Sequence, residues 1–171
     1  GLSTTFQDRG RPNLYHIGIP FSGAMDTRNF LITNKLVGND LNEAVLEFAL
    51  QGPKLRINEN DINCVVTGDV NFTIKKSSKV YKGECYKTFS LNNNDEIDIT
   101  STNNSMYGYF SISGGFKLKK IWNSYSTHLR SMVGPNKGNK IIEDDDLQFN
   151  KSSKQIIQRK INYVNSKIEF I

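Results

Sequence analysis

The residues best suited to chemistry lie near the start of the chain, in the run at residues 4–12. Here Gln7, Asp8 and Arg11 place an amide, a carboxylate and a guanidinium around one glycine and one proline. Because glycine and proline fix tight turns, these polar side chains can converge on a single ligand. A purely structural interpretation is equally good: Asp8 and Arg11 form a local salt bridge that holds the turn together.

A second polar group follows, with His16 ahead of Ser22 and Gly23 and with Asp26 at the start of a predicted helix. Small residues before a helix N-terminus let an anion or a carbonyl oxygen approach free backbone N–H groups. Ser22 can donate to such an oxygen, although Ser22 and Asp26 can equally be simple capping residues. An isolated histidine such as His16 is more often structural than catalytic.

The sequence lacks the usual signatures of a self-sufficient enzyme. It contains no Gly-x-Ser-x-Gly elbow, no Walker-type phosphate loop and no His-Glu-x-x-His pair. The two histidines, His16 and His128, argue against a histidine-based metal site. We therefore expect no metal site, and no ATP bound by this chain alone.

Beyond residue 44 the sequence reads as a series of short strands, each rich in Val, Ile, Phe, Tyr or Thr and separated by turn residues. Strands that recur at such short spacing favour an antiparallel barrel or sandwich over a parallel sheet. The expected strands are Val45–Leu50, Lys54–Asn58, Ile62–Thr67, Val70–Lys75, Val80–Phe89, Glu96–Thr100 and Met106–Ser113.

One substantial helix is predicted over Thr27–Val37, with Asp26 as its N-cap and Gly38 as its C-terminal stop. A weaker helical turn is expected within Ser126–Val133. The polar stretch after residue 150 resembles a linker, and Lys167–Ile171 is expected to begin a further strand. We accordingly expect a β domain over residues 1–150, and a linker with the start of a second, truncated domain over 151–171.

The net charge of +5 arises from an uneven distribution. Residues 1–70 hold six Lys or Arg against eight Asp or Glu, a balance of −2, whereas residues 71–171 hold 16 against nine, a balance of +7. The basic residues of the second part are scattered and form no arginine-rich stripe, so nucleic acid is not the expected partner. No stretch is apolar enough for a membrane span, and we expect a cytoplasmic protein without membrane contact.

The two cysteines, Cys64 and Cys85, stand alone in strand-like runs. Two isolated cysteines form neither a disulfide framework nor a zinc site. We expect two reduced thiols that pack as small hydrophobic side chains.

Several blocks in consistent order resemble the biotin-dependent carboxyltransferase family, which includes the KipI antagonist, the C subunit of 5-oxoprolinase, the second subunit of allophanate hydrolase and the carboxyltransferase part of urea carboxylase. The first eleven residues, GLSTTFQDRGR, resemble the family's opening GLxTTxQDxGR. The next blocks are HIGIP at 16–20, SGAMD at 22–26, NKLVGN at 34–39 and AVLE at 44–47, followed by GPKL at 52–55, TGD at 67–69 and SGGF at 113–116. The likeness covers about residues 1–147 and is densest over the first fifty.

The chain also departs from the family pattern in its later part. The family's GSRST is NSYST at residues 123–127, which loses a glycine and an arginine. The glycine-rich run that follows is thinned to VGPNKG at 133–138, and the usual Gly-Asp turn is Asp145-Asp146. If this region contributes to the ligand site, we expect substrate choice or activity to differ from the family pattern.

The resemblance implies a mainly β, antiparallel β-barrel fold of the cyclophilin-like superfamily, with an active site shared with a KipI-like partner. It implies a subunit of an ATP-dependent 5-oxoprolinase complex, which hydrolyses 5-oxoproline to glutamate with KipI-like and LamB/YcsF-like subunits. The full complex would use ATP. The alternatives are the carboxyltransferase module of urea carboxylase or allophanate metabolism, with carboxybiotin as the donor, and a non-catalytic regulator that binds a KipI-like protein.

Both reactions act on a small amide or lactam and require donors for a developing oxyanion and a positive group for an anion. The resemblance suggests Asp8, Asp26 and Glu47 as catalytic carboxylates. It suggests as substrate-binding residues Gln7, Arg11, His16, Ser22 and Gly23. From the same argument we expect the Asp8–Arg11 turn, His16 and the Ser22–Asp26 segment to approach one another in space.

Overall fold

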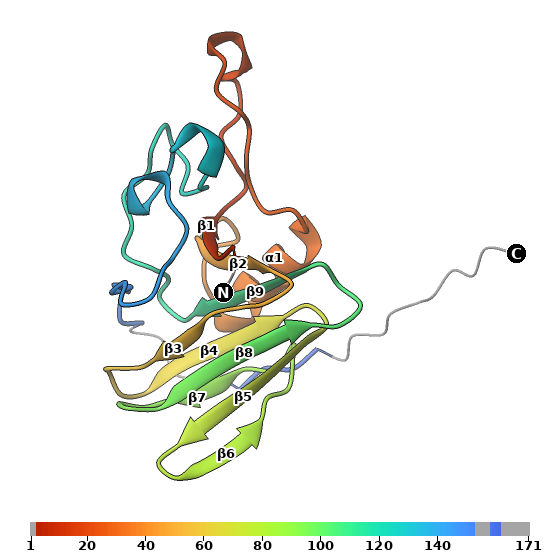
Figure 1. Cartoon of the computed structure of the whole chain (residues 1–171), viewed down its shortest axis with the longest axis vertical. Helices are drawn as coiled ribbons and strands as arrows, with labels where there is room; N and C mark the ends of the chain where they lie inside the picture. Colours follow the sequence, from red (N-terminus) through yellow and green to blue (C-terminus); the bar gives the residue numbers. More distant parts are fainter. Residues whose placement is uncertain (1–2, 153–157, 162–171) are drawn as a thin grey trace, which may run out of the picture.

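The computed structural model describes residues 3–152 and 158–161. It is built mainly from antiparallel strands, with one α-helix, α1 (Thr27–Val37), and three short 3-10 turns. Figure 1 shows two sheets in the body of the molecule and a hairpin, which contains η1 (Tyr15–Ile17), that extends away from them. The other 3-10 turns are η2 (Leu129–Ser131) and η3 (Asn136–Gly138).

The first sheet has five strands in the order β1-β2-β9-β4-β7, and every neighbouring pair is antiparallel. Its centre consists of β2, β9 and β4, and all residues of β4 are buried. Its members are β1 (Thr5–Gln7), β2 (Val45–Ala49), β4 (Ile62–Thr67), β7 (Phe89–Leu91) and β9 (Tyr107–Ile112).

The second sheet has four strands in the order β3-β8-β5-β6. The β5–β6 hairpin turns at Ser77, which has a positive φ of 52°, and a bulge shifts the β5–β8 register between Asn71 and Phe72. Its members are β3 (Lys54–Arg56), β5 (Val70–Lys76), β6 (Lys79–Lys82) and β8 (Glu96–Thr102).

The main hydrophobic core lies between the two sheets. Strand alternation directs one set of side chains inward from each sheet, including Phe48, Phe72, Ile99 and Phe110. The opposite face of the five-stranded sheet is covered by α1, and Phe30 packs there with strand residues. The central strands are therefore buried on both faces, which explains why they read as continuous apolar runs.

Helix α1 begins and ends where the sequence predicts. The carboxylate of Asp26 accepts a hydrogen bond from the Asn29 N–H at 3.0 Å, so Asp26 is the N-cap. At the other end, Gly38 adopts a left-handed conformation with φ of 77°. Asn39 N then bonds to the carbonyl of Asn34, which closes the last turn.

Most of the expected strands are confirmed, but the single strand predicted over Val80–Phe89 is wrong. The chain leaves the second sheet after Lys82 and enters the first sheet at Phe89. Gly83 lies where the chain leaves the second sheet. It packs so closely against Phe72 that a Cβ there would lie 2.0 Å from the ring. Tyr86 then takes a positive φ of 60°, which ends any regular extended conformation.

Strand β1 was not predicted. Polar residues flank Phe6 on both sides and conceal a strand that is buried along its whole length. The expected helical turn over Ser126–Val133 contracts to η2. The mainly β, antiparallel architecture is confirmed, but no closed barrel forms among the described residues, where β1 and β7 are the edges of one sheet and β3 and β6 of the other. The predicted strand Lys167–Ile171 lies outside those residues.

Two properties of the described part bear on expectations from the sequence. Cys64 and Cys85 are free thiols, and Cys64 is buried in the main core, as expected. Burial raises the pKa of the Cys64 thiol. Within residues 3–152 and 158–161, none of the helices combines the length and hydrophobicity needed to cross a bilayer.

Candidate functional site

The buried carboxylate of Asp8 is the centre of a largely buried polar group. It follows β1 directly, and its oxygens accept four hydrogen bonds: from the N–H groups of Gly10 and Tyr125 and from the hydroxyls of Ser124 and Ser126. A buried charge is stable only when it is paired or well hydrogen-bonded, and these donors meet that need. We call Asp8, Arg11, Ser22, Ser124 and Ser126 the Asp8 hub.

Arg11 belongs to the same hub and is only 1% exposed. Its guanidinium donates to the backbone carbonyl of Ser126 and, at 3.2 Å, to the hydroxyl of Ser22. Among the described residues no ion pair within 4 Å joins it to a carboxylate, so the alternative interpretation, a direct Asp8–Arg11 salt bridge, is wrong. Burial lowers the pKa of Arg11, and the nearby charge of Asp8 partly offsets that effect.

The serines that hold Asp8 come from the segment at 123–127, which sequence reasoning noted only as a departure from the family. Ser124 and Ser126 match the two serines of the family's GSRST, so the retained part of that motif is the part that binds Asp8. Asn123 replaces the family's glycine and keeps a positive φ of 61°, which asparagine tolerates better than most residues. The two serines that the chain shares with the motif were therefore the sequence feature that could have pointed to the partners of Asp8.

Gln7 strengthens this attachment from the neighbouring position on β1. Its side-chain amide donates to the Thr5 hydroxyl at 2.9 Å and to the Thr127 carbonyl at 3.0 Å. Like Asp8, Gln7 therefore joins the N-terminal strand to residues 124–127.

A second polar group surrounds Glu47 on β2, at the N-terminus of α1. One oxygen of its carboxylate, Oε2, accepts hydrogen bonds from the Met25 N–H at 2.7 Å and the Tyr109 hydroxyl at 2.8 Å. The Tyr109 oxygen in turn accepts from the Asp26 N–H at 2.7 Å. We call Glu47, Tyr109, Asp26 and Asn29 the Glu47 cluster.

The surroundings of Glu47 raise the pKa of its carboxyl. Burial is the main cause that raises the pKa of Glu47, the nearby charge of Asp26 also raises it, and the two hydrogen bonds oppose the change. Burial also raises the pKa of Tyr109, followed by the charge of Glu47. Tyr109 therefore remains a neutral hydroxyl that connects Glu47 to the helix N-terminus. Its contact with Glu47 was not predicted, because no motif in the sequence of β9 distinguishes Tyr109 from an ordinary strand residue.

Asp26 and Asn29 complete the cluster on the helix side. The second carboxylate oxygen of Asp26 accepts from the Asn29 side-chain amide at 2.6 Å. The carbonyl oxygen of that amide accepts from the hydroxyl of Tyr86 at 2.9 Å. These contacts fix Asp26 as a capping and orienting residue.

Ser22 and Gly23 connect the two groups. The Ala24 N–H donates to the carbonyl of Asp8 at 2.9 Å, and the Arg11 N–H donates to the carbonyl of Phe21 at 2.8 Å. Gly23 has a φ of +98°, and a Cβ there would lie 3.0 Å from the backbone of Arg9. The expected approach of the Asp8–Arg11 turn and the Ser22–Asp26 segment is therefore confirmed.

His16 does not join them. It is exposed and lies in η1, at the end of the hairpin that Figure 1 shows extending away from the sheets. The backbone bonds around it are local, such as Gly18 N to the carbonyl of Tyr15. The expected proximity of His16 to the other segments is wrong, because the intervening residues form an extended hairpin with its own tip.

The sequence that builds this fold matches a known family. A model of the carboxyltransferase domain, subdomains A and B, matches residues 17–169. The chain therefore belongs to the carboxyltransferase-domain family.

Three individual proteins of known name are similar to this chain. The chain is 33% identical over 144 residues to the C subunit of 5-oxoprolinase from Haemophilus influenzae, covering 84% of this chain and 45% of that protein. It is 27% identical over 156 residues to urea amidolyase of Saccharomyces cerevisiae, covering 91% of this chain and 8% of that protein. The solved urea carboxylase of Kluyveromyces lactis superposes with a TM-score of 0.82 at 28% identity, covering 88% of this chain and 13% of that one. The chain thus spans under half the length of the 5-oxoprolinase relative.

The two groups differ in what they can do chemically. The Asp8 oxygens already accept four hydrogen bonds from neighbouring donors. Glu47 has a raised pKa, and its bonds from Met25 and Tyr109 both reach Oε2. It lies at the positive end of a helix dipole, where a negative group or a polarised carbonyl is stabilised. Among the described residues, no group of three or more His, Cys, Asp or Glu is arranged to hold a metal ion.

Proposed function

We propose that this chain is part of an ATP-dependent complex that hydrolyses 5-oxoproline to glutamate. The observation that carries the proposal is the 33% identity to the C subunit of 5-oxoprolinase across 84% of the chain. The proposed partners are a KipI-like and a LamB/YcsF-like subunit in the cytoplasm, and the ATP site belongs to the assembly. The Glu47 cluster supports a reaction at an amide or lactam, as the following roles explain.

Opening a lactam requires a proton for the leaving nitrogen and donors for the oxygen of the attacked carbonyl. In this proposal Glu47 is the proton-transferring group, because its raised pKa brings its titration closer to neutral pH. The N-terminus of α1, where Asp26 already accepts from the Asn29 N–H, supplies the positive end of the helix dipole for the carbonyl oxygen. Tyr109 and Asp26 position Glu47 and the helix, respectively.

The Asp8 hub acts in this proposal by position. Arg11 holds Ser22 and the segment that leads into α1, while Asp8 and Gln7 attach residues 124–127 to β1. A ligand anion would meet Arg11 only after the hub opens, since the guanidinium is enclosed. We therefore assign Arg11, Asp8, Gln7 and Gly23 positioning roles, with Ser22 as the hub residue closest in sequence to the start of the helix.

The carboxyltransferase module of a urea-carboxylating enzyme is the second candidate. It is favoured by the likeness to urea amidolyase over 91% of the chain and to the urea carboxylase structure. There a carboxyl group from carboxybiotin would reach urea, which is also a small amide, at the same cluster.

The test is reconstitution of the complex from purified subunits. We expect ATP-dependent release of glutamate from 5-oxoproline when this chain is present, and no turnover from this chain alone. Loss of activity on addition of avidin, together with carboxylation of urea, would instead support the urea carboxylase role. Unchanged glutamate release in a complex assembled without this chain would contradict the catalytic proposal and favour a regulator that binds a KipI-like protein.

A further inference from the structure

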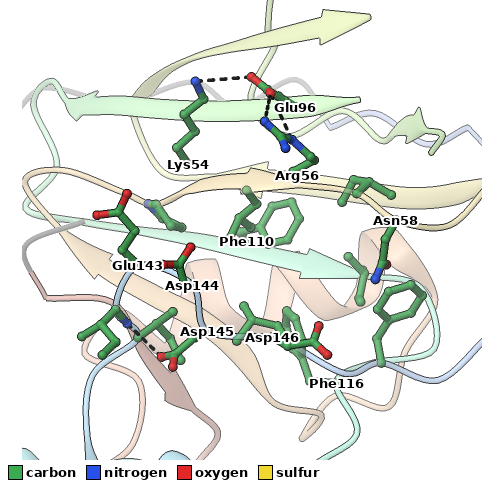
Figure 2. Close-up of a pocket in the computed structure, with 18 of the residues that line it drawn as sticks. Lys54, Arg56, Asn58, Glu96, Phe110, Phe116, Glu143, Asp144, Asp145 and Asp146 are labelled. Atoms are coloured by element: carbon green, nitrogen blue, oxygen red, sulfur yellow. Dashed lines mark hydrogen bonds and ion pairs between the residues drawn. The ribbon is translucent and has the colours of Figure 1, made fainter. Parts of the chain in front are cut away.

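A cleft of about 930 Å³ lies at the border of the main core, on the face of the first sheet opposite α1, between β3 and the segment at 140–149. Its floor is apolar and comes from the first sheet and the chain after it, with Ile62, Phe110, Ile112 and Phe116 as contributors. Figure 2 shows Phe110 and Phe116 along the floor, with Lys54 and Arg56 on one wall and the acidic residues 143–146 on the other. None of these residues belongs to the Asp8 hub or the Glu47 cluster.

One wall of the cleft is a free strand edge. Within the part of the chain that the structure describes, β3 is the last strand of its sheet and pairs only with β8. Pro53 and Ile57 use their backbone groups to bond to the β8 side. Antiparallel pairing alternates, so the N–H and C=O groups of Lys54 and Arg56 point away from β8 and toward the cleft. Such an edge is a template for another strand.

The opposite wall is acidic. Glu143, Asp144 and Asp146 are exposed there, and no ion pair of the described residues involves Glu143 or Asp144. On the β3 wall, Glu96 forms ion pairs with Lys54 at 3.3 Å and with Arg56 at 2.9 Å. The lining holds three basic residues, Lys54, Arg56 and Lys140, against five acidic ones, Glu96 and residues 143–146, a balance of −2.

We propose that this cleft binds an extended segment of a partner polypeptide that adds a strand to the free edge of β3. Alternate side chains of that segment are apolar and cover the floor, and the others are Lys or Arg and reach the acidic wall. The apolar floor favours apolar side chains, the free edge favours an extended backbone, and the acidic wall favours Lys or Arg. A small amide such as 5-oxoproline lacks the length to use all three. The inference does not depend on which reaction the complex performs.

A synthetic peptide tests the proposal on the full chain. The probe is the acetylated and amidated hexapeptide Lys-Val-Lys-Ile-Lys-Val, compared with its Glu-for-Lys counterpart, and both are titrated while backbone amide signals are followed by NMR. We expect the basic peptide to shift the amides of residues 54–57 and to slow hydrogen exchange at Lys54 and Arg56. The acidic peptide is expected to bind at least ten-fold more weakly. Equal binding of both peptides, or no binding of either, would overturn the proposal.

Two variants at one position separate the backbone contribution from the side chain. Arg56→Pro removes an outward N–H and is tolerated on an edge strand, and it should weaken basic-peptide binding about ten-fold. Arg56→Ala keeps that N–H and removes a positive charge, so binding should be equal or slightly tighter. If Arg56→Pro fails to fold, N-methylation of the peptide residues that face β3 tests the same bonds. Unchanged affinity of the N-methylated peptide would contradict strand addition.

The acidic wall is tested by Glu143→Gln combined with Asp144→Asn. Exposed ion pairs contribute modestly, so we expect about a five-fold loss of affinity for the basic peptide at low salt, and less at high salt. Sedimentation of the free chain checks the other occupants. A dimer that Arg56→Pro dissociates would show that a second copy fills the cleft, and amide shifts at residues 54–57 with 5-oxoproline would show a small-molecule site. Either result would overturn the proposal.

Discussion

The Asp8 hub and the Glu47 cluster are both built around a buried carboxylate, yet they have different chemical potential. Asp8 accepts four hydrogen bonds spread over both oxygens, and two of them come from the hydroxyls of Ser124 and Ser126. Glu47 accepts two, both on Oε2, and burial raises its pKa. Burial alone therefore does not mark a reactive carboxylate. The extent to which the protein satisfies its charge separates a structural group from one able to exchange a proton.

The two groups are also connected in a definite order. The hub fixes the path of residues 22–24 through bonds to Asp8 and Arg11, and those residues lead into the helix whose N-terminus contacts Glu47. Loss of the hub should therefore affect the whole N-terminal region. Loss of the Glu47 carboxylate should affect only the chemistry next to α1.

The largest expected effect on stability comes from Asp8→Ala. It leaves several buried donors without an acceptor, and we expect a loss of about 3–5 kcal/mol in the free energy of unfolding. Denaturant unfolding measures the loss. Glu143→Ala is the control, because Glu143 is exposed and has no left-handed backbone conformation, and it should change stability by less than about 0.5 kcal/mol. Equal stability of the two variants would contradict the hub.

The next effect concerns the link between the groups, at Gly23. Gly23→Ala places a Cβ 3.0 Å from the Arg9 backbone at a φ of +98°, and should cost about 2–3 kcal/mol. Gly18→Ala shares a positive φ of 77° but has nothing within 4 Å of its Cβ. It should cost only about 1 kcal/mol. Thermal unfolding of both variants separates the effect of the close contact at Gly23 from the backbone strain that both positions share. A larger loss of stability for Gly18→Ala than for Gly23→Ala would show that the chain around Gly23 is not tightly packed.

The pH dependence of stability sharpens the comparison further. A carboxyl whose pKa is raised on folding binds more protons in the folded than in the unfolded state, so stability falls as pH rises from the ordinary range for Glu through the raised pKa of Glu47. Glu47→Gln should remove that contribution and flatten the profile over this window. Melting temperatures across the weakly acidic to neutral range provide the measurement. Identical slopes for both proteins would mean that Glu47 does not titrate abnormally.

The smallest effect is expected at His16. Its side chain is exposed on the hairpin tip, so His16→Ala should change unfolding free energy by less than about 0.5 kcal/mol and leave turnover of the reconstituted complex within about two-fold. Paired melting and activity assays test this. A large loss of activity with unchanged stability would place the hairpin tip at a site completed by a partner protein.

Local signals predicted much of the fold. The capping residues Asp26 and Gly38 defined α1, and alternating or continuous apolar runs defined most strands, because capping and burial depend on nearby residues. The strand break after Lys82 escaped prediction because it depends on Gly83 meeting Phe72 from another strand. Closure of the sheets is likewise a long-range property that no local pattern encodes.

The candidate site was predictable only in part. The proximity of Asp8, Arg11 and Ser22 followed from their turn residues. The side-chain donors that reach each carboxylate, Ser124 and Ser126 for Asp8 and Tyr109 for Glu47, lie 62 or more positions away in the sequence. Long-range pairing therefore decides how each carboxylate is hydrogen-bonded, whereas burial is the main cause that raises the pKa of Glu47.

The most direct test of this account is the turnover of folded molecules in the reconstituted complex for Glu47→Gln beside Arg11→Ala, with melting temperatures measured on the same samples. We predict that Glu47→Gln keeps its melting temperature within a few degrees and loses about 100-fold or more in turnover, as expected for removal of a proton-transferring group. Arg11→Ala should lose stability while its folded fraction retains most of its turnover. The reverse outcome, with Glu47→Gln active and stable Arg11→Ala inactive, would contradict the account and make Arg11 the ligand-binding residue.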